Sequence, residues 1–365
     1  MLKMPCLWGK LRLNNMKKKH ITIVGGGIAG CMTAMELVKR GCRVTVVERN
    51  QIASQTSGES SWAGAGLAFP LLPWMYRDEV NQLALAGANL YQSVSAQLLQ
   101  ETGIDPEYMQ SGMLIKPPFD ETVATQWCMR NHVPFEKTGD DLLLPQVAQI
   151  RNPRLLQALK QWLLSHKVTL LENTQLLPIA NTTTLNQWKT TRGETLEADL
   201  FIVTSGAWSY ELLKETAVNL TIKPMRGQIL LYQIPVNTLP HIVYQDGFYL
   251  LQRRDGYLLA GSTLEDVGFD TSVTEAAKLE MQAKAEAILP ALKGMSIHKH
   301  WSGLRPGTPE NLPTISQHPT IANLYLNTGH FRYGVTMAPA SAKLICDLIF
   351  GEKPEIDPTP YRCLS

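Results

Sequence analysis

The chain has 365 residues, 18% of them charged, and its 34 Lys and Arg against 32 Asp and Glu give a formal net charge of +2. This near balance leaves no polycationic face for a phosphate backbone and argues against a dedicated nucleic-acid binder. No apolar run approaches the roughly 18 residues that a membrane-spanning helix needs, so we expect no membrane span. The length predicts two domains of ordinary globular composition.

The cysteine pattern and the N-terminal residues give indications of the cellular compartment. Six cysteines are scattered without a CxxC pair or a metal-ligand spacing. This pattern favours reduced thiols in the cytoplasm, with no zinc or other metal site and no structural disulfide. Residues 1–19 carry six basic residues without a continuous apolar core, which is not the pattern of a cleaved secretory signal. We interpret this segment as a disordered extension.

Residues 20–48 have every part of a dinucleotide-binding unit: a strand, a glycine turn, a helix, a second strand and an acidic end. Gly25 gives the tight turn, Gly27 lets the backbone approach a pyrophosphate, and Gly30 permits close packing of the helix on the strand. The pyrophosphate would then meet the positive start of the helix. Glu48 is placed to bind a ribose hydroxyl, and its charge disfavours the extra phosphate of NADP.

The segments that follow are predicted to lie first outside this unit and then, at residues 198–209, in its parallel sheet again. Residues 51–75 are rich in Gly, Ala and Ser, which suits a backbone that passes close to a flat ligand. Helical apolar spacing follows over residues 77–104, and a turn and a strand come after it. A second amphipathic helix is predicted at residues 153–166. Residues 198–209 predict a buried strand that ends in a glycine turn, so the chain returns to a parallel sheet.

A second excursion predicts an antiparallel sheet. Apolar and polar side chains alternate in three segments between residues 227 and 266, and Asp255 with Gly256 forms the best hairpin signal of the chain. Tyr249 lies on one of these strands. Residues 274–289 predict a helix that a threonine caps. A strand and a glycine turn then lead into the last helix.

Taken in their order, these segments resemble the flavin-dependent amino-acid oxidases of the D-amino acid oxidase superfamily, and most of all its glycine oxidase branch, which is associated with thiamine biosynthesis. The similarity is carried by VGGGIAG with Glu48, SSWAGAGLAFPLLPWMY, GIDPE, TSGAWS, the Tyr249 hairpin, GLRPGTPENLP and GHFRYG. It implies an α/β fold with a Rossmann-type FAD-binding domain of the glutathione reductase-like kind. A second α+β domain with an antiparallel sheet would bind the substrate.

The resemblance also implies how the chain is divided. Residues 20–95, 150–222 and 300–352 would form a discontinuous FAD-binding domain. Residues 96–149 and 223–299 would form the substrate-binding domain. A homo-oligomer is a further implication of the family.

The implied cofactor is a non-covalent FAD, because the HKHWSGLRPGT segment lacks the cysteine that attaches the flavin in the related sarcosine oxidases. Its isoalloxazine would lie against residues 60–67, and the glycine turn before the last helix suits a flavin oxygen that accepts negative charge. The resemblance implies cofactor contacts at Gly25, Gly27, Ile28, Ala29, Gly30, Glu48, Arg49, Ser60, Ser61, Ala65, Gly66, Leu67, Leu176, Ser205, Gly206, His330, Phe331, Arg332, Tyr333, Gly334, Val335 and Thr336.

Three residues match the family's substrate positions by type and spacing: Tyr249, Arg305 and Arg332. We favour Arg332 for a bidentate grip on an α-carboxylate, because its planar guanidinium fits two oxygens. Tyr249 would add a hydroxyl donor, and Arg305 would hold the shape of the pocket or tune the flavin. Gly247 and Phe248 stand where some glycine oxidases carry a histidine and a small residue, so a substrate larger than glycine stays open.

The predicted activity is oxidative deamination of glycine or another small amine or D-amino acid. The resemblance implies hydride transfer from Cα to flavin N5, hydrolysis of the imine to an oxo acid and ammonia, and formation of hydrogen peroxide from oxygen. A D-amino acid dehydrogenase that passes electrons to a quinone remains open, because the sequence does not separate it from an oxidase. A tRNA-modifying FAD oxidoreductase is the third alternative, disfavoured by the lack of a methyltransferase domain and of a basic surface.

Overall fold

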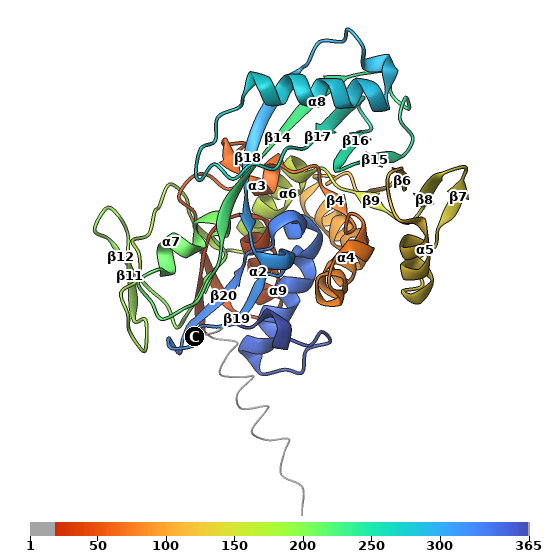
Figure 1. The fold of residues 1–365 in the computed structure, drawn as a ribbon. Helices are drawn as coiled ribbons and strands as arrows, with labels where there is room; N and C mark the ends of the chain where they lie inside the picture. The colour runs from red at the N-terminus through yellow and green to blue at the C-terminus, as the bar shows by residue number, and fades with distance from the viewer. Residues whose placement is uncertain (1–18, 364–365) are drawn as a thin grey trace, which may run out of the picture.

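The computed structural model describes residues 19–363. Residues 1–19 were interpreted as a disordered extension. Of these, only Lys19 lies in the described range. A six-stranded sheet and a nine-stranded sheet dominate this range, and in Figure 1 the nine-stranded sheet lies above the other. No helix within residues 19–363 combines the length and the apolar character that crossing a bilayer requires.

The six-stranded sheet forms the core of the nucleotide-binding unit. Its order is β10 (Thr169–Leu171), β2 (Arg43–Val47), β1 (His20–Val24), β13 (Leu200–Val203), β20 (Leu324–Thr328) and β19 (Thr314–Gln317). The first five strands are parallel and β19 is antiparallel. The central strands β1 and β13 are short, apolar and almost fully buried, as expected for parallel strands covered on both faces.

Four helices pack together on one face of this sheet: α2 (Ile28–Lys39), α4 (Asp78–Thr102), α6 (Asn152–Ser165) and α9 (Gly334–Phe350). The helices predicted at residues 77–104 and 153–166 are thus confirmed within two residues at each end. The opposite face packs against the hairpin of β11 (Gln187–Lys189) and β12 (Thr195–Glu197) and against α7 (Ser209–Leu213). Both faces of the parallel sheet are therefore covered.

The nine-stranded sheet is mixed. Its order is β3 (Gly58–Glu59), β18 (Lys299–Gly307), β14 (Lys223–Gln233), β17 (Tyr257–Gly261), β16 (Phe248–Gln252), β15 (Ile242–Gln245), β6 (Met113–Lys116), β8 (Asp141–Leu144) and β7 (Glu136–Thr138). Six neighbouring pairs are antiparallel, including the predicted hairpin of β16 and β17, where Gly256 has φ +85°. The pairs β15–β6 and β18–β3 are parallel, and each joins strands from distant parts of the chain.

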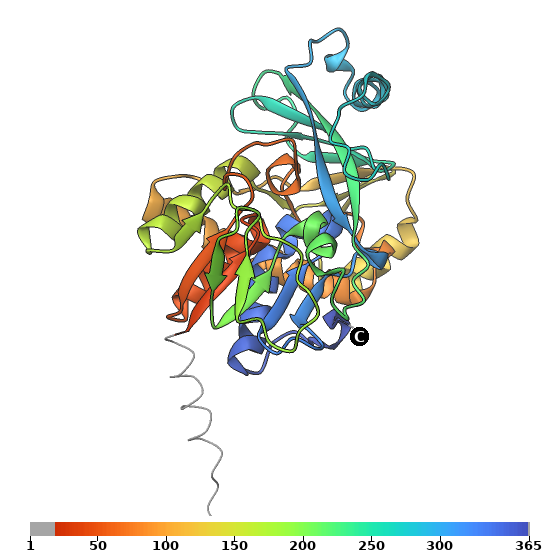
Figure 2. The same cartoon turned by 90° about the vertical axis from the view of Figure 1, so that its left-hand side faces the viewer.

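Helices cover both faces of the nine-stranded sheet. The helix predicted at residues 274–289 is α8 (Glu275–Ile288), and the Thr274 side chain caps it by accepting a hydrogen bond from Ala277 N. Figure 2 views α8 close to end-on, on the side of this sheet that faces away from the six-stranded sheet. On the inner side, α5 (Glu121–Arg130) packs near β6 and β8.

The remaining elements of the described range are short. They are α3 (Ser60–Ala63), the small sheet of β4 (Leu67–Ala68), β9 (Ala148–Gln149) and β5 (Met109–Gln110), and the 3-10 helices η1 (Pro73–Met75), η2 (Gly206–Trp208), η3 (Pro290–Leu292), η4 (Pro309–Asn311), η5 (Phe331–Tyr333) and η6 (Thr359–Tyr361). The predicted boundary at residue 300 falls inside β18, which pairs with β14 along its whole length. The division into two domains stays a prediction.

Candidate active site

Two adjoining cavities lie where the two large sheets meet. The first lies at the carboxyl ends of β1, β2 and β13. The second reaches residues of the nine-stranded sheet. Their linings share Gly27, Ser60, Ser61, Thr204 and Gly206. The two cavities therefore form one elongated site, which is the shape an extended dinucleotide requires.

The glycine turn after β1 allows the close approach that the sequence predicts. Gly25 has φ +114°, and a Cβ there would lie 2.8 Å from the Thr204 carbonyl oxygen. Gly30 does not line either cavity; a Cβ there would lie 1.9 Å from the Gly25 carbonyl oxygen, so its role is packing. Gly27 caps α2 and lines both cavities. The start of α2 thus faces the shared part of the site with backbone amides.

Glu48 has a structural task as well as a place in the first cavity. Its Oε2 accepts a hydrogen bond from Gly26 N at 2.8 Å, and its Oε1 accepts one from Asn50 N at 2.9 Å. Each carboxylate oxygen has a second lone pair that can accept from a ribose hydroxyl. The acid therefore holds the glycine turn in place beside the position predicted for the ribose.

An aromatic wall in the first cavity was not predicted. The Arg49 guanidinium carbon lies 3.5 Å from the centroid of the Trp208 ring, and the Phe269 ring stacks on Trp208 with centroids 5.5 Å apart. All three side chains line the cavity. They come from three segments far apart in the sequence, and no spacing within any one of them signals the contact. Arg49 was predicted as a cofactor contact, but its stacking was not.

Glu59 also lines the first cavity and was missed. Burial raises the pKa of its carboxyl to about 7, against the hydrogen bond from Asn50 Nδ2 at 2.8 Å, and the nearby charge of Glu48 raises it further. Glu59 is therefore neutral below about pH 7 and charged above it. Its charge would appear beside a ligand that carries a diphosphate.

We therefore expect the FAD affinity of the apoprotein to fall as the pH rises through 7, by about threefold to tenfold because solvent screens this half-buried group. The variant Glu59→Gln should bind FAD with no such fall. Fluorescence titration of the apoprotein with FAD between about pH 5.5 and 8.5 measures both profiles. A wild-type profile as flat as that of the variant would refute this assignment.

The second cavity contains polar atoms that lack partners. His330 Nε2 and Asn327 Oδ1 are buried, line this cavity, and have no hydrogen-bond partner among residues 19–363. Burial lowers the pKa of His330 to about 4, so its ring is neutral at pH 7. Buried polar groups in proteins nearly always have partners, so a polar ligand is expected here.

The predicted turn before the last helix borders the same cavity. Residues 330–336 line it, and α9 begins at Gly334 with no side-chain cap, so that the first backbone amides of a 17-residue helix face the site. Ala65, Gly66 and Leu67 of the small-residue segment also line this cavity. The unpartnered atoms, the open helix start and the small residues together fit a flat polar ring system.

The three predicted substrate residues come together in the second cavity, from β16, β18 and η5. Tyr249 is 6% exposed, and burial raises the pKa of its hydroxyl although the charge of Arg305 opposes this shift. The hydroxyl therefore stays protonated and can donate. Within the described part of the chain, the lining of this cavity includes no Asp, Glu or Lys. The two arginines are thus its only charged side chains there.

The two arginines differ in setting. Arg305 is deep in the cavity, where burial lowers its pKa; its Nη2 donates to Ser262 Oγ at 2.7 Å and its Nη1 to the Thr263 carbonyl at 3.1 Å. Three of its five N–H groups are left for a ligand. Arg332 is exposed at the edge of the cavity and forms no hydrogen bond or ion pair with residues 19–363. Its guanidinium carbon lies 5.6 Å from the Phe331 ring centroid.

Comparison with known proteins identifies the family of this chain. The family model described as "FAD dependent oxidoreductase" (DAO) matches residues 20–348. The chain belongs to this family. Its α/β fold and its FAD dependence, both predicted from the sequence, are thereby confirmed.

Several proteins with similar sequence or structure are named as glycine oxidases or as ThiO/ThiG proteins. A glycine oxidase of Pseudomonas aeruginosa is 37% identical over 94% of this chain and 98% of its own length. The crystal structure of a glycine oxidase from Geobacillus kaustophilus superposes with a TM-score of 0.86 at 25% identity, over 94% of this chain and 98% of that one. The bifunctional protein ThiO/ThiG of Synechocystis is 29% identical over 91% of this chain and 52% of its own length. The resemblance stated from the sequence is confirmed.

Within this family, the predicted cofactor residues lie in consistent places. All but Gly30 line the two cavities. Gly25, Glu48, Arg49, Leu176 and Ser205 lie at the first, while Ile28, Ala29, Ala65, Gly66, Leu67 and the 330–336 turn lie at the second. Gly27, Ser60, Ser61 and Gly206 line both. Their individual contacts with FAD stay predictions. The sequence missed Glu59 and Trp208, although each lies within two residues of a predicted cofactor residue. It also missed Phe269 and Ser262, which approach the site through tertiary contacts.

Proposed function

We propose that this FAD-dependent enzyme oxidises glycine or another small amine that carries an α-carboxylate. The observation that carries the proposal is the convergence of Tyr249, Arg305 and Arg332 in one cavity beside the turn at residues 330–336. Two cationic side chains and a protonated hydroxyl, with no acidic side chain in the described lining, favour an anionic ligand. The similarity to glycine oxidases supports an amino acid as that ligand.

The arrangement modifies the roles expected from sequence. We propose that Arg305 and Tyr249 bind the substrate carboxylate, because Tyr249 is buried, Arg305 is half-buried, and a charge-assisted hydrogen bond is stronger away from water. Arg332, favoured from sequence, would contact the same carboxylate or the entering substrate from the exposed edge. Anchoring one end of the substrate fixes the position of its Cα, and this orientation is the main catalytic contribution of these side chains.

The cavity offers no strong base for the amine. His330 has a pKa of about 4, and Tyr249 is protonated, so neither takes a proton from an ammonium group at pH 7. The substrate amine would therefore react in its neutral form, whose lone pair assists loss of hydride from Cα. When bound, FAD supplies the acceptor for that hydride. Water then hydrolyses the released imine to an oxo acid and ammonia.

The substrate pocket has room beyond glycine. Gly247 lines the second cavity, and a Cβ built there meets no atom within 4 Å. A small N-substituent or side chain would fit in this open space. We therefore include N-methylglycine and small D-amino acids among the substrates to be tested.

The proposed role is in thiamine biosynthesis, with the imine or oxo acid as the product supplied. The support is the similarity to glycine oxidases together with that to the bifunctional ThiO/ThiG protein of Synechocystis. The cytoplasmic location and the homo-oligomer stay predictions from sequence. The tRNA-modifying alternative is not favoured by these relatives.

An amine panel tests the proposal. Purified holoenzyme is incubated in air with glycine, N-methylglycine, D-alanine and L-alanine, and hydrogen peroxide and the released amine are measured. With at least one of the first three we expect peroxide and released amine in equal amounts, the amine being ammonia from glycine or D-alanine and methylamine from N-methylglycine. Flavin reduction without peroxide, relieved by an added quinone, would point to the dehydrogenase instead. No flavin reduction by any amine would refute the proposed function.

A further inference from the structure

The guanidinium of Arg305 occupies a slot between two backbone segments. On one side, Ser262 Oγ and the Thr263 carbonyl accept its two hydrogen bonds. On the other side lies Gly227 of β14, where a Cβ would be 2.0 Å from Arg305 Nη1 and 2.4 Å from its guanidinium carbon. The flat group therefore lies directly against the backbone of Gly227.

Nothing in the backbone conformation requires glycine at position 227. Its φ is not positive, and it pairs with Gly303 in the regular ladder of β14 and β18. The three atoms nearest to a Cβ at this position all belong to the Arg305 guanidinium. The absence of a side chain at Gly227 therefore serves the placement of Arg305.

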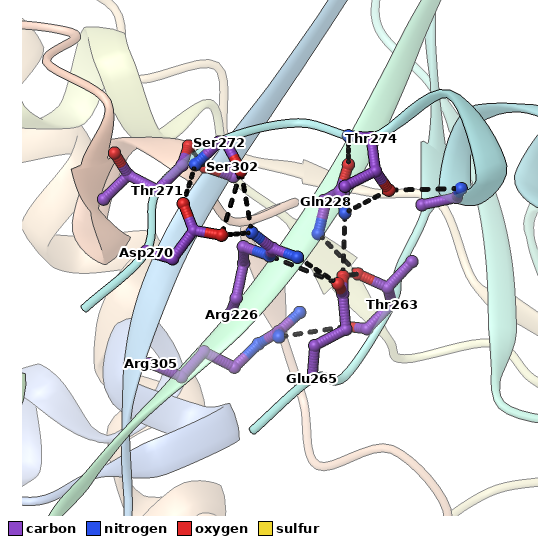
Figure 3. A network of polar contacts seen from close by, with 11 residues as sticks. Arg226, Gln228, Thr263, Glu265, Asp270, Thr271, Ser272, Thr274, Ser302 and Arg305 are labelled. Carbon is purple, nitrogen blue, oxygen red and sulfur yellow. Dashed lines mark hydrogen bonds and ion pairs between the residues drawn. The ribbon is translucent and has the colours of Figure 1, made fainter. Parts of the chain in front are cut away.

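The other wall of the slot belongs to residues 262–274, which we call the strap. The first residue of the strap, Ser262, accepts the hydrogen bond from Arg305. Further along the strap, Phe269 belongs to the aromatic wall of the first cavity. Figure 3 shows how Arg226, next to Gly227 on β14, holds it. Arg226 forms ion pairs with Glu265 at 2.6 Å and with Asp270 at 2.5 Å. Backbone hydrogen bonds in both directions also join Arg226 to Glu265.

Two hydrogen bonds connect the ion pair to Arg305. Glu265 Oε1 accepts a hydrogen bond from Thr263 Oγ1 at 2.5 Å, and the Thr263 carbonyl accepts from Arg305 Nη1. Gln228 also helps to hold Thr263 in place, because its backbone N–H donates a hydrogen bond to Thr263 Oγ1 at 2.9 Å. The Arg226 side chain is 4% exposed, so little solvent screens its attraction to Glu265.

We propose that Gly227 and the Arg226–Glu265 ion pair position the Arg305 guanidinium for the substrate carboxylate. Gly227 leaves the space, and the ion pair fixes the strap whose oxygen atoms turn the guanidinium. These are positioning residues, because they act on the substrate through Arg305. The inference rests on the proposed function, which assigns the carboxylate to Arg305 and Tyr249.

The test uses the variants Gly227→Ala and Glu265→Gln in the holoenzyme. A methyl group at position 227 meets the flexible end of Arg305 first, and glutamine at position 265 keeps the size but removes the charge. We expect KM for the best amine to rise roughly tenfold or more, while kcat changes less than about threefold. Titration with acetate, read from the flavin absorption spectrum, should show the same rise in Kd. The melting temperature of Gly227→Ala should stay close to that of the wild type.

Gly307→Ala is the matched control. Gly307 lies on β18, and a Cβ there would be 2.5 Å from Met225 Cγ and 3.1 Å from the Lys223 carbonyl oxygen, so the methyl group mainly displaces a flexible side chain other than Arg305. This variant should keep the wild-type KM and acetate Kd. Wild-type values in both Gly227→Ala and Glu265→Gln would overturn the proposal, as would a loss of FAD or kcat at unchanged KM. Should Gly227→Ala fail to fold, Glu265→Gln alone decides. If the wild type oxidises no amine, the proposed function fails, while the acetate titration still tests the slot.

Discussion

Protein with leucine in place of Gly27 is expected to purify folded but colourless. Gly27 lines both cavities and precedes α2 with φ −71°, a value that any residue adopts. A Cβ there would meet only the Ser61 side chain, at 2.9 Å from its Oγ, so the fold has room to adjust. A leucine side chain would instead fill the space between the glycine turn and the pyrophosphate, and FAD affinity should fall by a factor on the order of 100 or more.

The ratio of visible flavin absorbance to protein absorbance measures this loss, and circular dichroism checks the fold. Gly27→Ala is the matched control, because one methyl group displaces little more than the Ser61 hydroxyl and should leave most of the protein yellow. Gly25→Ala is not equivalent. At that position the backbone has φ +114° and the obstacle is the Thr204 carbonyl, so the fold itself would suffer. A fully yellow Gly27→Leu protein would place the pyrophosphate elsewhere.

Exchange of Arg305 for methionine should abolish most of the activity while FAD stays bound. The side chain keeps most of its length and an apolar stem but loses the half-buried charge and its free N–H groups. Charge-assisted hydrogen bonds to a carboxylate in such a setting contribute about 2 to 4 kcal/mol, which corresponds to a fall in kcat/KM of about 30-fold to 1000-fold. Steady-state kinetics and the flavin spectrum give both quantities.

The same exchange at Arg332 ranks the two arginines. Its side chain is exposed, so water competes for its hydrogen bonds and screens its charge, and a loss of only about tenfold in kcat/KM is expected. A larger loss at Arg332 than at Arg305 would restore the order that the sequence favoured. Equal wild-type kinetics in both variants would remove the carboxylate from this cavity.

Local signals in the chain were enough for much of the fold. The strand, glycine turn and helix around Gly25 and Gly27 depend on neighbouring residues, as does the threonine cap of α8. The long amphipathic helices α4 and α6 follow from apolar periodicity. The parallel pairs β15–β6 and β18–β3 had no such signal, because each joins strands more than 100 residues apart.

For the site, the sequence by itself determined the cofactor class and the three candidate substrate side chains, because both depend on residue type in recognisable motifs. Only the tertiary structure decided how these side chains are used. It set Arg305 against Gly227 and the strap, left Arg332 at the exposed edge, and placed Glu59 and Phe269 beside the first cavity. Burial, dielectric setting and hydrogen-bond partners arise when distant segments meet, so no single stretch of sequence contains them.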